Sequence, residues 1–90
     1  MSDLDEARRA EQTLREQLAD LVRARARADS ESRRLSERAG LPGAEPALGE
    51  LAERYRAQGE RLQAEVEALR ADLRRQEAEL ERLRAAEEGA

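Results

Sequence analysis

The sequence contains no cysteine and no histidine, which excludes disulfides, thiol nucleophiles and the usual zinc sites. Tyr55 is its only aromatic residue, so it has little large apolar surface for a compact globular core. No apolar run approaches the roughly 20 residues of a membrane-spanning helix. The N-terminal segment MSDLDEARRA is acidic and lacks an apolar core, unlike a signal peptide. We therefore expect a cytoplasmic protein with no membrane segment.

Lysine, isoleucine, asparagine and phenylalanine are also absent, and all 17 basic residues are arginine. The missing residues have AT-rich codons, which indicates a GC-rich bacterial or phage genome. The abundance of arginine is therefore no sign of phosphate binding in itself. The net charge of −4 also argues against a general nucleic-acid binder.

Charged residues make up 42% of the 90 residues, and alanine, glutamate, arginine and leucine dominate. This composition is typical of long helices and coiled coils. Disorder is the alternative for so polar a chain. The regular spacing of the leucines argues against it, and the length allows one small domain.

Both prolines and three of the five glycines fall in residues 40–49, GLPGAEPALG. This segment divides the chain into a helix over about 3–39, a turn over 40–45 and a helix over about 46–88. Ser2 is a suitable N-cap for the first helix, and Pro46 is tolerated in the first turn of the second. At the end of the first helix we expect Gly40 in a left-handed conformation, with Leu41 folded back on Leu35.

Apolar residues recur at alternating spacings of three and four in both helices, which is the heptad pattern of a coiled coil. We call these positions the seam. Its large members are Leu4, Leu14, Leu18, Leu21, Leu35, Tyr55, Leu62, Val66, Leu69, Leu73, Leu80 and Leu83.

Residues of unlike size or polarity within the seam predict how the two helices pair. When facing residue numbers sum to 87, the apolar layers are Leu4 with Leu83, Leu14 with Leu73, Leu18 with Leu69, and Leu21 with Val66. The same register sets Glu11 opposite Gln76 and Ala28 opposite Gly59. It sets Ser32 opposite Tyr55, where a hydroxyl pair could form, and leaves Arg25 opposite Leu62 as the one poor match. Across the flanks, Arg8 and Arg15 approach Glu77, and Asp29 approaches Arg56. The predicted fold is all-α, a long antiparallel two-helix coiled-coil hairpin.

A parallel homodimer through the second helix alone is the alternative. The pairs Glu65–Arg70 and Glu79–Arg84 between chains favour it, whereas Asp72 would repel Glu77. A lone two-helix hairpin should be marginally stable, so we expect self-association or a protein partner.

The second helix carries a second regular stripe on the positions opposite the seam: Ala57, Ala64, Ala71, Ala78 and Ala85. Alanine is the best helix former, which is one explanation. The other explanation is a close-packed second interface, because the first helix has no such stripe.

The turn end of the hairpin is slightly basic. Residues 22–61 carry a net charge of +2, whereas residues 1–21 and 62–90 each carry −3. A phosphate-tracking surface there would use Arg23, Arg27, Arg34 and Arg54. The simpler interpretation is a solvated helix face, because no aromatic platform exists for base stacking.

No arrangement in the sequence supports catalysis. It has no histidine or cysteine pair for nucleophile–base chemistry and no glycine-rich phosphate loop after a strand. Acidic pairs such as Glu65 and Asp72 are expected on an open helix surface rather than in a pocket that would suit catalysis. We expect a protein that is not an enzyme and that binds no cofactor, metal or small molecule.

In overall plan the chain resembles the helical-hairpin arm of seryl-tRNA synthetases, which holds tRNA. It also resembles the hairpin domain of Gre-type factors, which enters the RNA polymerase channel. The Gre-type tip carries paired acids for a metal, whereas this turn offers Glu45, with Glu50 following on the helix. The resemblance is one of architecture, and we transfer no functional residues.

The first functional hypothesis is therefore a structural or adaptor coiled coil that self-associates or docks onto a larger protein assembly. The alternative is a nucleic-acid- or RNA-polymerase-binding hairpin that acts through its turn end.

Overall fold

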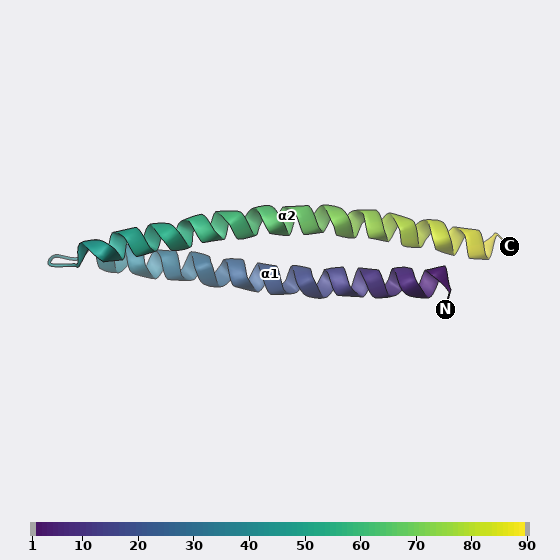
Figure 1. The fold of residues 1–90 in the computed structure, drawn as a ribbon, viewed down its shortest axis with the longest axis horizontal. Helices are drawn as coiled ribbons and strands as arrows, with labels where there is room; N and C mark the ends of the chain where they lie inside the picture. The colour runs from purple at the N-terminus through teal and green to yellow at the C-terminus, as the bar shows by residue number, and fades with distance from the viewer. Residues whose placement is uncertain (1, 90) are drawn as a thin grey trace.

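The computed structural model describes residues 2–89 as two long helices, α1 (Asp3–Ala39) and α2 (Pro46–Glu88). They lie side by side and run in opposite directions, so the turn occupies one end of a rod and both chain ends the other (Figure 1). The rod measures 72 × 17 × 13 Å. The predicted all-α helical hairpin is confirmed. Between residues 2 and 89, no helix combines the length and the apolarity that crossing a bilayer requires.

The N-terminus of α1 is capped as the sequence predicts. The backbone N–H of Asp5 donates to the side-chain oxygen of Ser2 at 3.2 Å. Asp3, Asp5 and Glu6 occupy the first turn, where their negative charge faces the positive end of the helix dipole. Local side-chain chemistry therefore defines this helix end.

Replacing Ser2 with alanine is expected to lower the free energy of unfolding by about 1 kcal/mol, because one helix N–H loses its acceptor. Urea unfolding followed by far-ultraviolet circular dichroism measures the change. Ser30→Ala is the matched control, since Ser30 is exposed in the interior of α1. An equal loss in both variants would contradict a capping role for Ser2.

The turn differs from the prediction at Gly40. Gly40 has φ −81° and ψ −6°, a right-handed conformation, and Leu41 is 62% exposed rather than folded back on Leu35. The left-handed conformation lies at Gly43, with φ 78°.

The chain reverses through Leu41–Pro42–Gly43–Ala44, where the N–H of Ala44 donates to the carbonyl of Leu41 at 3.2 Å. Proline at the second position and a positive-φ glycine at the third are the features of a type II turn. The left-handed residue that the sequence predicts at Gly40 is therefore Gly43, in the Pro-Gly pair. Pro46 then opens α2 at its first turn, as predicted.

Contacts along the seam follow the register in which facing numbers sum to 87. At the end that holds the chain termini, Leu4 and Ala7 cluster with Leu80, and Leu83 packs against them. Near the turn, Ala28 faces Gly59, and a Cβ at Gly59 would lie 4.0 Å from the Cβ of Ala28.

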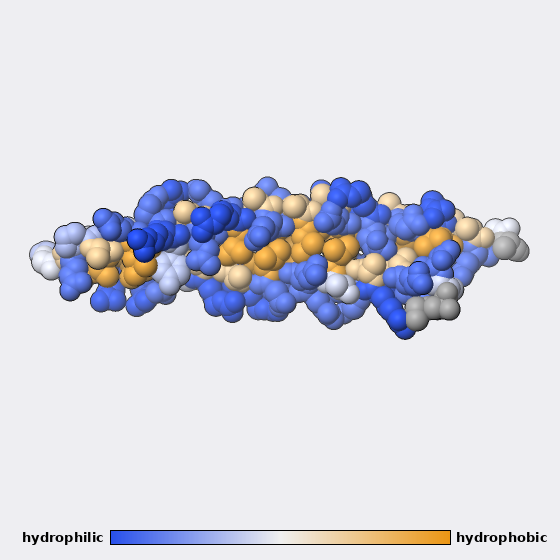
Figure 2. All heavy atoms as spheres, in the orientation of Figure 1, coloured by the Kyte–Doolittle hydropathy of each residue, from blue (hydrophilic) through white to orange (hydrophobic). Residues whose placement is uncertain are grey.

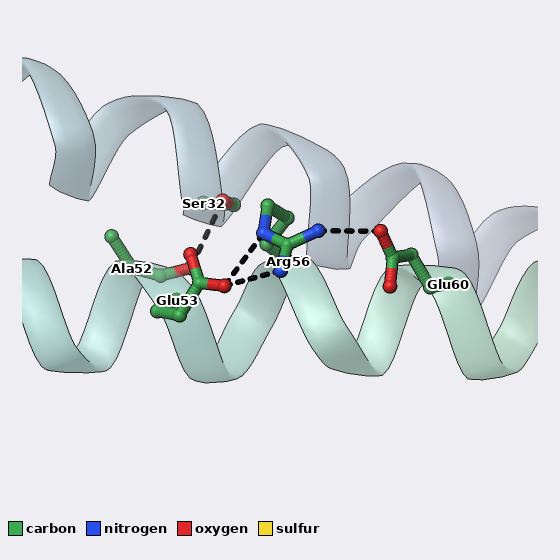
Figure 3. Close-up of polar contacts among 5 residues, drawn as sticks. All are labelled: Ser32, Ala52, Glu53, Arg56 and Glu60. Carbon is green, nitrogen blue, oxygen red and sulfur yellow. Dashed lines mark hydrogen bonds and ion pairs between the residues drawn. The ribbon is translucent and has the colours of Figure 1, made fainter.

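Two polar seam residues bond to the backbone of the other helix. Gln76 Nε2 donates to the carbonyl of Ala7 at 3.0 Å, and the Ser32 hydroxyl donates to the carbonyl of Ala52 at 3.0 Å (Figure 3). The Ser32 hydroxyl thus donates to the backbone rather than to the Tyr55 hydroxyl, whereas the facing of Glu11 and Gln76 stays a prediction. Both acceptors belong to alanines, whose small side chains leave the helix backbone within reach.

Candidate protein-interaction surface

The two lines of seam residues on α2 differ in burial. Positions 52, 59, 66, 73 and 80 are all buried, whereas positions 55, 62, 69, 76 and 83 are all half-buried. A single partner helix covers one line and leaves the other at the edge of the contact. The hairpin therefore keeps part of its seam in contact with solvent.

Hydrophobic atoms form a band between the two helices on the face shown in Figure 2, with hydrophilic atoms above and below it. Five of the predicted large seam residues are buried: Leu4, Leu35, Val66, Leu73 and Leu80. The other seven are half-buried: Leu14, Leu18, Leu21, Tyr55, Leu62, Leu69 and Leu83.

Two adjoining grooves run along one side of the rod, which we call the groove side. The first has a volume of about 480 Å³ and is lined by Gln17, Asp20, Leu21, Glu65, Ala68, Leu69 and Asp72. The second has a volume of about 320 Å³ and is lined by Ala24, Arg27, Ala28, Glu31, Tyr55 and Gln58. The lining positions are 17, 20, 21, 24, 27, 28 and 31 on α1 and 55, 58, 65, 68, 69 and 72 on α2, and in each helix they share one helix face. The floor of the first groove is apolar, and three carboxylates stand on its rim.

The opposite side of the rod is lined mainly by charged residues. Its two grooves are bounded by Glu11, Arg15, Glu77, Glu81 and Arg84 near the chain ends and by Arg25, Asp29, Arg56 and Glu60 nearer the turn. Arg15 and Glu77 approach each other across the helices at 3.9 Å, as predicted. The half-buried leucines Leu21 and Leu69 therefore open onto the groove side.

Most ion pairs of the described residues join neighbours three or four apart on one helix. Arg8 faces Asp5 at 4.0 Å rather than Glu77, and Asp29 pairs with Arg25 at 3.4 Å rather than with Arg56. Neighbours on one helix meet with less loss of side-chain freedom than partners on two helices, so Arg8 and Asp29 form these ion pairs within α1. Asp29 and Arg56 still border one groove.

Arg56 illustrates such local pairing. It donates to Glu53 and Glu60 on its own helix (Figure 3). The hydrogen bond that Arg56 donates to Glu53 is the main cause that raises the pKa of Arg56, and the same bond lowers the pKa of Glu53. Exposed pairs of this kind stabilise a fold only slightly, because water and salt screen their attraction. The hairpin therefore depends on its seam rather than on its surface charges.

The structure places the alanine stripe on the outer face of α2. Ala64, Ala78 and Ala85 are exposed, and Ala57 and Ala71 are half-buried. A second interface along this stripe stays a prediction.

The four turn-end arginines lie beside acidic neighbours. Arg23 pairs with Asp20, and Arg34 pairs with Glu31, whose pKa is lowered chiefly by that hydrogen bond. Arg27 lines a groove together with Glu31. Arg54 lies in a separate shallow groove with Glu50 and Glu53. Arg27 and Arg34, seven residues apart, lie on the groove side, and Arg54 lies between that side and the outer face of α2, whereas Arg23 lies on the outer face of α1.

Comparison with models of known protein families, with curated proteins and with solved structures yields no match for this chain.

Proposed function

We propose that the hairpin is a non-catalytic adaptor of the cytoplasm that works by binding protein along its groove side. The observation that carries this proposal is the apolar floor formed by Leu21, Ala68 and Leu69, two of which are seam leucines that a single helix pair leaves half-buried. Helices that expose one apolar stripe become stable by burying it against another element. A third helix, or a second hairpin, would complete such a bundle.

The shape of the rod supports the same proposal. The rod is 72 Å long, and the seam residues recur at spacings of three and four along it. A partner helix would therefore meet a continuous surface rather than a single pocket. Interfaces of this kind derive affinity from central apolar contacts and orientation from the polar rim. Asp20, Glu65 and Asp72 supply that rim here.

Ala68 allows the proposal to be tested without disturbing the seam. It is exposed, lines the first groove and lies outside the heptad positions that hold the hairpin together. Ala68→Glu is expected to fill the groove, to keep the helicity, and to abolish both self-association in light scattering and retention of host proteins on the immobilised hairpin. Ala19→Glu is the matched control, since Ala19 is an exposed alanine of α1 outside both grooves of the groove side. If neither readout depends on residue 68, the proposed function is wrong.

The alternative, binding of nucleic acid or RNA polymerase at the turn end, rests on the arginines of residues 22–61. It predicts affinity for nucleic acid that falls steeply with salt, because each phosphate contact releases counterions. Filter binding at two salt concentrations, with Arg27→Gln and Arg34→Gln together as the variant, separates the two functions. Tight, salt-sensitive binding that this variant loses would favour the alternative.

A further inference from the structure

We propose that the groove side binds the groove side of a second copy of this chain, with the two hairpins antiparallel, to form a four-helix bundle. This inference rests on the proposed function and names the partner. It is carried by the way charge is distributed along the groove side, which differs from the distribution on the opposite side.

The membership of the groove side follows from the structure and from the seven-residue repeat. The residues that line the two grooves outside the seam occupy two heptad positions on each helix, those of Gln17 and Asp20 on α1 and those of Glu65 and Ala68 on α2. The other members of the groove side lie at multiples of seven residues from these four, in either direction. Two electrostatic effects agree with the extension to the ends of the rod. The pKa of Arg82 is raised mainly by Glu79 and also by the nearby Asp3, and the pKa of Arg34 is raised mainly by Glu31 and also by Tyr55.

The half of the groove side next to the chain ends is acidic. Its charged residues are Asp3, Glu6, Asp20, Glu65, Asp72 and Glu79 against Arg75 and Arg82, a net charge of −4. The half next to the turn is basic. Its charged residues are Arg27, Arg34, Arg38, Arg54 and Arg61 against Glu31, a net charge of +4.

The opposite side shows no such separation. Near the chain ends it carries Arg8, Arg15, Arg70, Arg74 and Arg84 against Asp5, Glu11, Glu67, Glu77, Glu81 and Glu88, a net charge of −1. Near the turn it carries Arg25, Arg33 and Arg56 against Asp29, Glu53 and Glu60, a net charge of zero. The segregation of charge is therefore a property of the side that also exposes the seam leucines.

A surface that is negative in one half and positive in the other is complementary to its own reversed copy. A two-fold axis through the middle of the rod sets the basic half of each hairpin on the acidic half of the other, and a two-fold interface is the commonest way in which identical chains pair. A parallel pair would set like charges together over the whole length.

The apolar residues fit the same arrangement. Leu21, Leu62 and Leu69 lie near the middle of the rod, where the axis brings the two copies of the first groove together. Leu51 is 39% exposed near the turn and would lie on the terminal half of the partner. Exposed ion pairs stabilise little individually, so the charges select the antiparallel orientation and the apolar layers supply the affinity.

Other occupants fit less well. A helix of uniform charge from another protein would complement one half of the groove side and be repelled by the other. A nucleic acid would be repelled by the acidic half. The second copy satisfies both halves at once.

Light scattering of the purified chain tests the association. The chain has a mass of 10.1 kDa, and we expect about twice that mass for the wild type and for Ala19→Glu. Ala68→Glu is expected to be a monomer with unchanged helicity. A wild type that stays monomeric up to hundreds of micromolar, while capture of host proteins still depends on residue 68, would overturn this inference and leave the proposed function standing.

Two charge-reversal variants test the complementarity. The first, Arg34→Glu with Arg54→Glu and Arg61→Glu, makes both halves of the groove side negative. The second, Glu65→Arg with Asp72→Arg and Glu79→Arg, makes both halves positive. Each variant alone is expected to be monomeric, and an equimolar mixture is expected to restore a dimer. A mixture that stays monomeric, or either variant dimerising alone, would contradict the pairing of opposite halves.

Orientation is tested with single cysteines, because the described chain has none of its own. In the antiparallel dimer the two copies of residue 51 lie toward opposite ends of the bundle, so Leu51→Cys is expected not to form a disulfide-linked dimer on oxidation. Rapid cross-linking of Leu51→Cys would indicate a parallel dimer. Dissociation by Ala71→Glu with Ala78→Glu, but not by Ala68→Glu, would assign the interface to the alanine stripe instead.

Discussion

Replacing Leu80 with alanine is expected to lower the free energy of unfolding by about 2–5 kcal/mol, the range of buried leucine truncations. Leu80 is 2% exposed and lies in one cluster with Leu4 and Ala7. The seam is only one layer of side chains thick, so no second layer can move in to fill the space. A marginally stable hairpin should lose most of its helicity as a result.

Urea unfolding followed by circular dichroism, at one fixed protein concentration, measures this effect. The fixed concentration matters because self-association adds stability by mass action. Leu41→Ala is the control, since Leu41 is 62% exposed in the turn and should change stability by only a few tenths of a kcal/mol. Equal losses in the two variants would mean that the seam does not hold the helices together.

The helix ends and the pairing register are predictable from the sequence because each depends on a local or periodic signal. Ser2 before an acidic turn, and Pro46 after a glycine-rich segment, mark helix starts by their own chemistry. The register follows from matching small and polar seam positions, and the packing of Ala28 against Gly59 satisfies it.

Two features of the turn sequence each predict the position of the left-handed residue, and they predict different positions. A glycine directly after a helix favours a left-handed cap, and the Pro-Gly pair three residues later favours a type II turn. One positive-φ residue is enough to reverse the chain, and it lies at Gly43. Proline at position 42 restricts its own backbone in the way the turn requires, and this signal was present in the sequence.

The unequal burial of the two seam lines was not predictable from the heptad pattern. That pattern treats Leu69 and Leu73 as equivalent, yet Leu73 is buried and Leu69 lines the first groove. The difference arises because α1 covers one line of α2 and leaves the other line at the edge of the rod. The hydrogen bond from Gln76 to a backbone carbonyl was equally hidden, since side-chain pairing rules do not include backbone acceptors.

The pair Ala28→Cys and Gly59→Cys is expected to form a disulfide within one chain and to stabilise the hairpin by roughly 3–4 kcal/mol, the entropic value for closing a loop of this length. The Cβ separation of 4.0 Å falls in the range that disulfides adopt. Gly59 lies inside α2 with an ordinary helical backbone, so a side chain there is not strained by conformation.

The obstacle to this disulfide is the carboxylate of Asp29, which lies against the space that a Cβ at Gly59 would enter. Asp29 is held there by an ion pair with Arg25, and both side chains are more than two-fifths exposed. The carboxylate can therefore rotate into solvent at little cost. The single variant Gly59→Ala measures the cost of moving Asp29 by itself. Its helix propensity is expected to raise the free energy of unfolding by up to about 1 kcal/mol, less the cost of moving Asp29.

Mass on a non-reducing gel and urea unfolding with and without reductant measure the outcome for the double cysteine variant. An oxidised monomer that unfolds at higher urea than its reduced form would demonstrate that α1 and α2 of one chain face each other at this layer. A product consisting only of cross-linked dimers would instead mean that the helices pair between chains. The layer of Ala28 and Gly59 lies beside the second groove. In the oxidised hairpin the disulfide keeps the seam closed, so groove-side association can be measured without separation of α1 from α2.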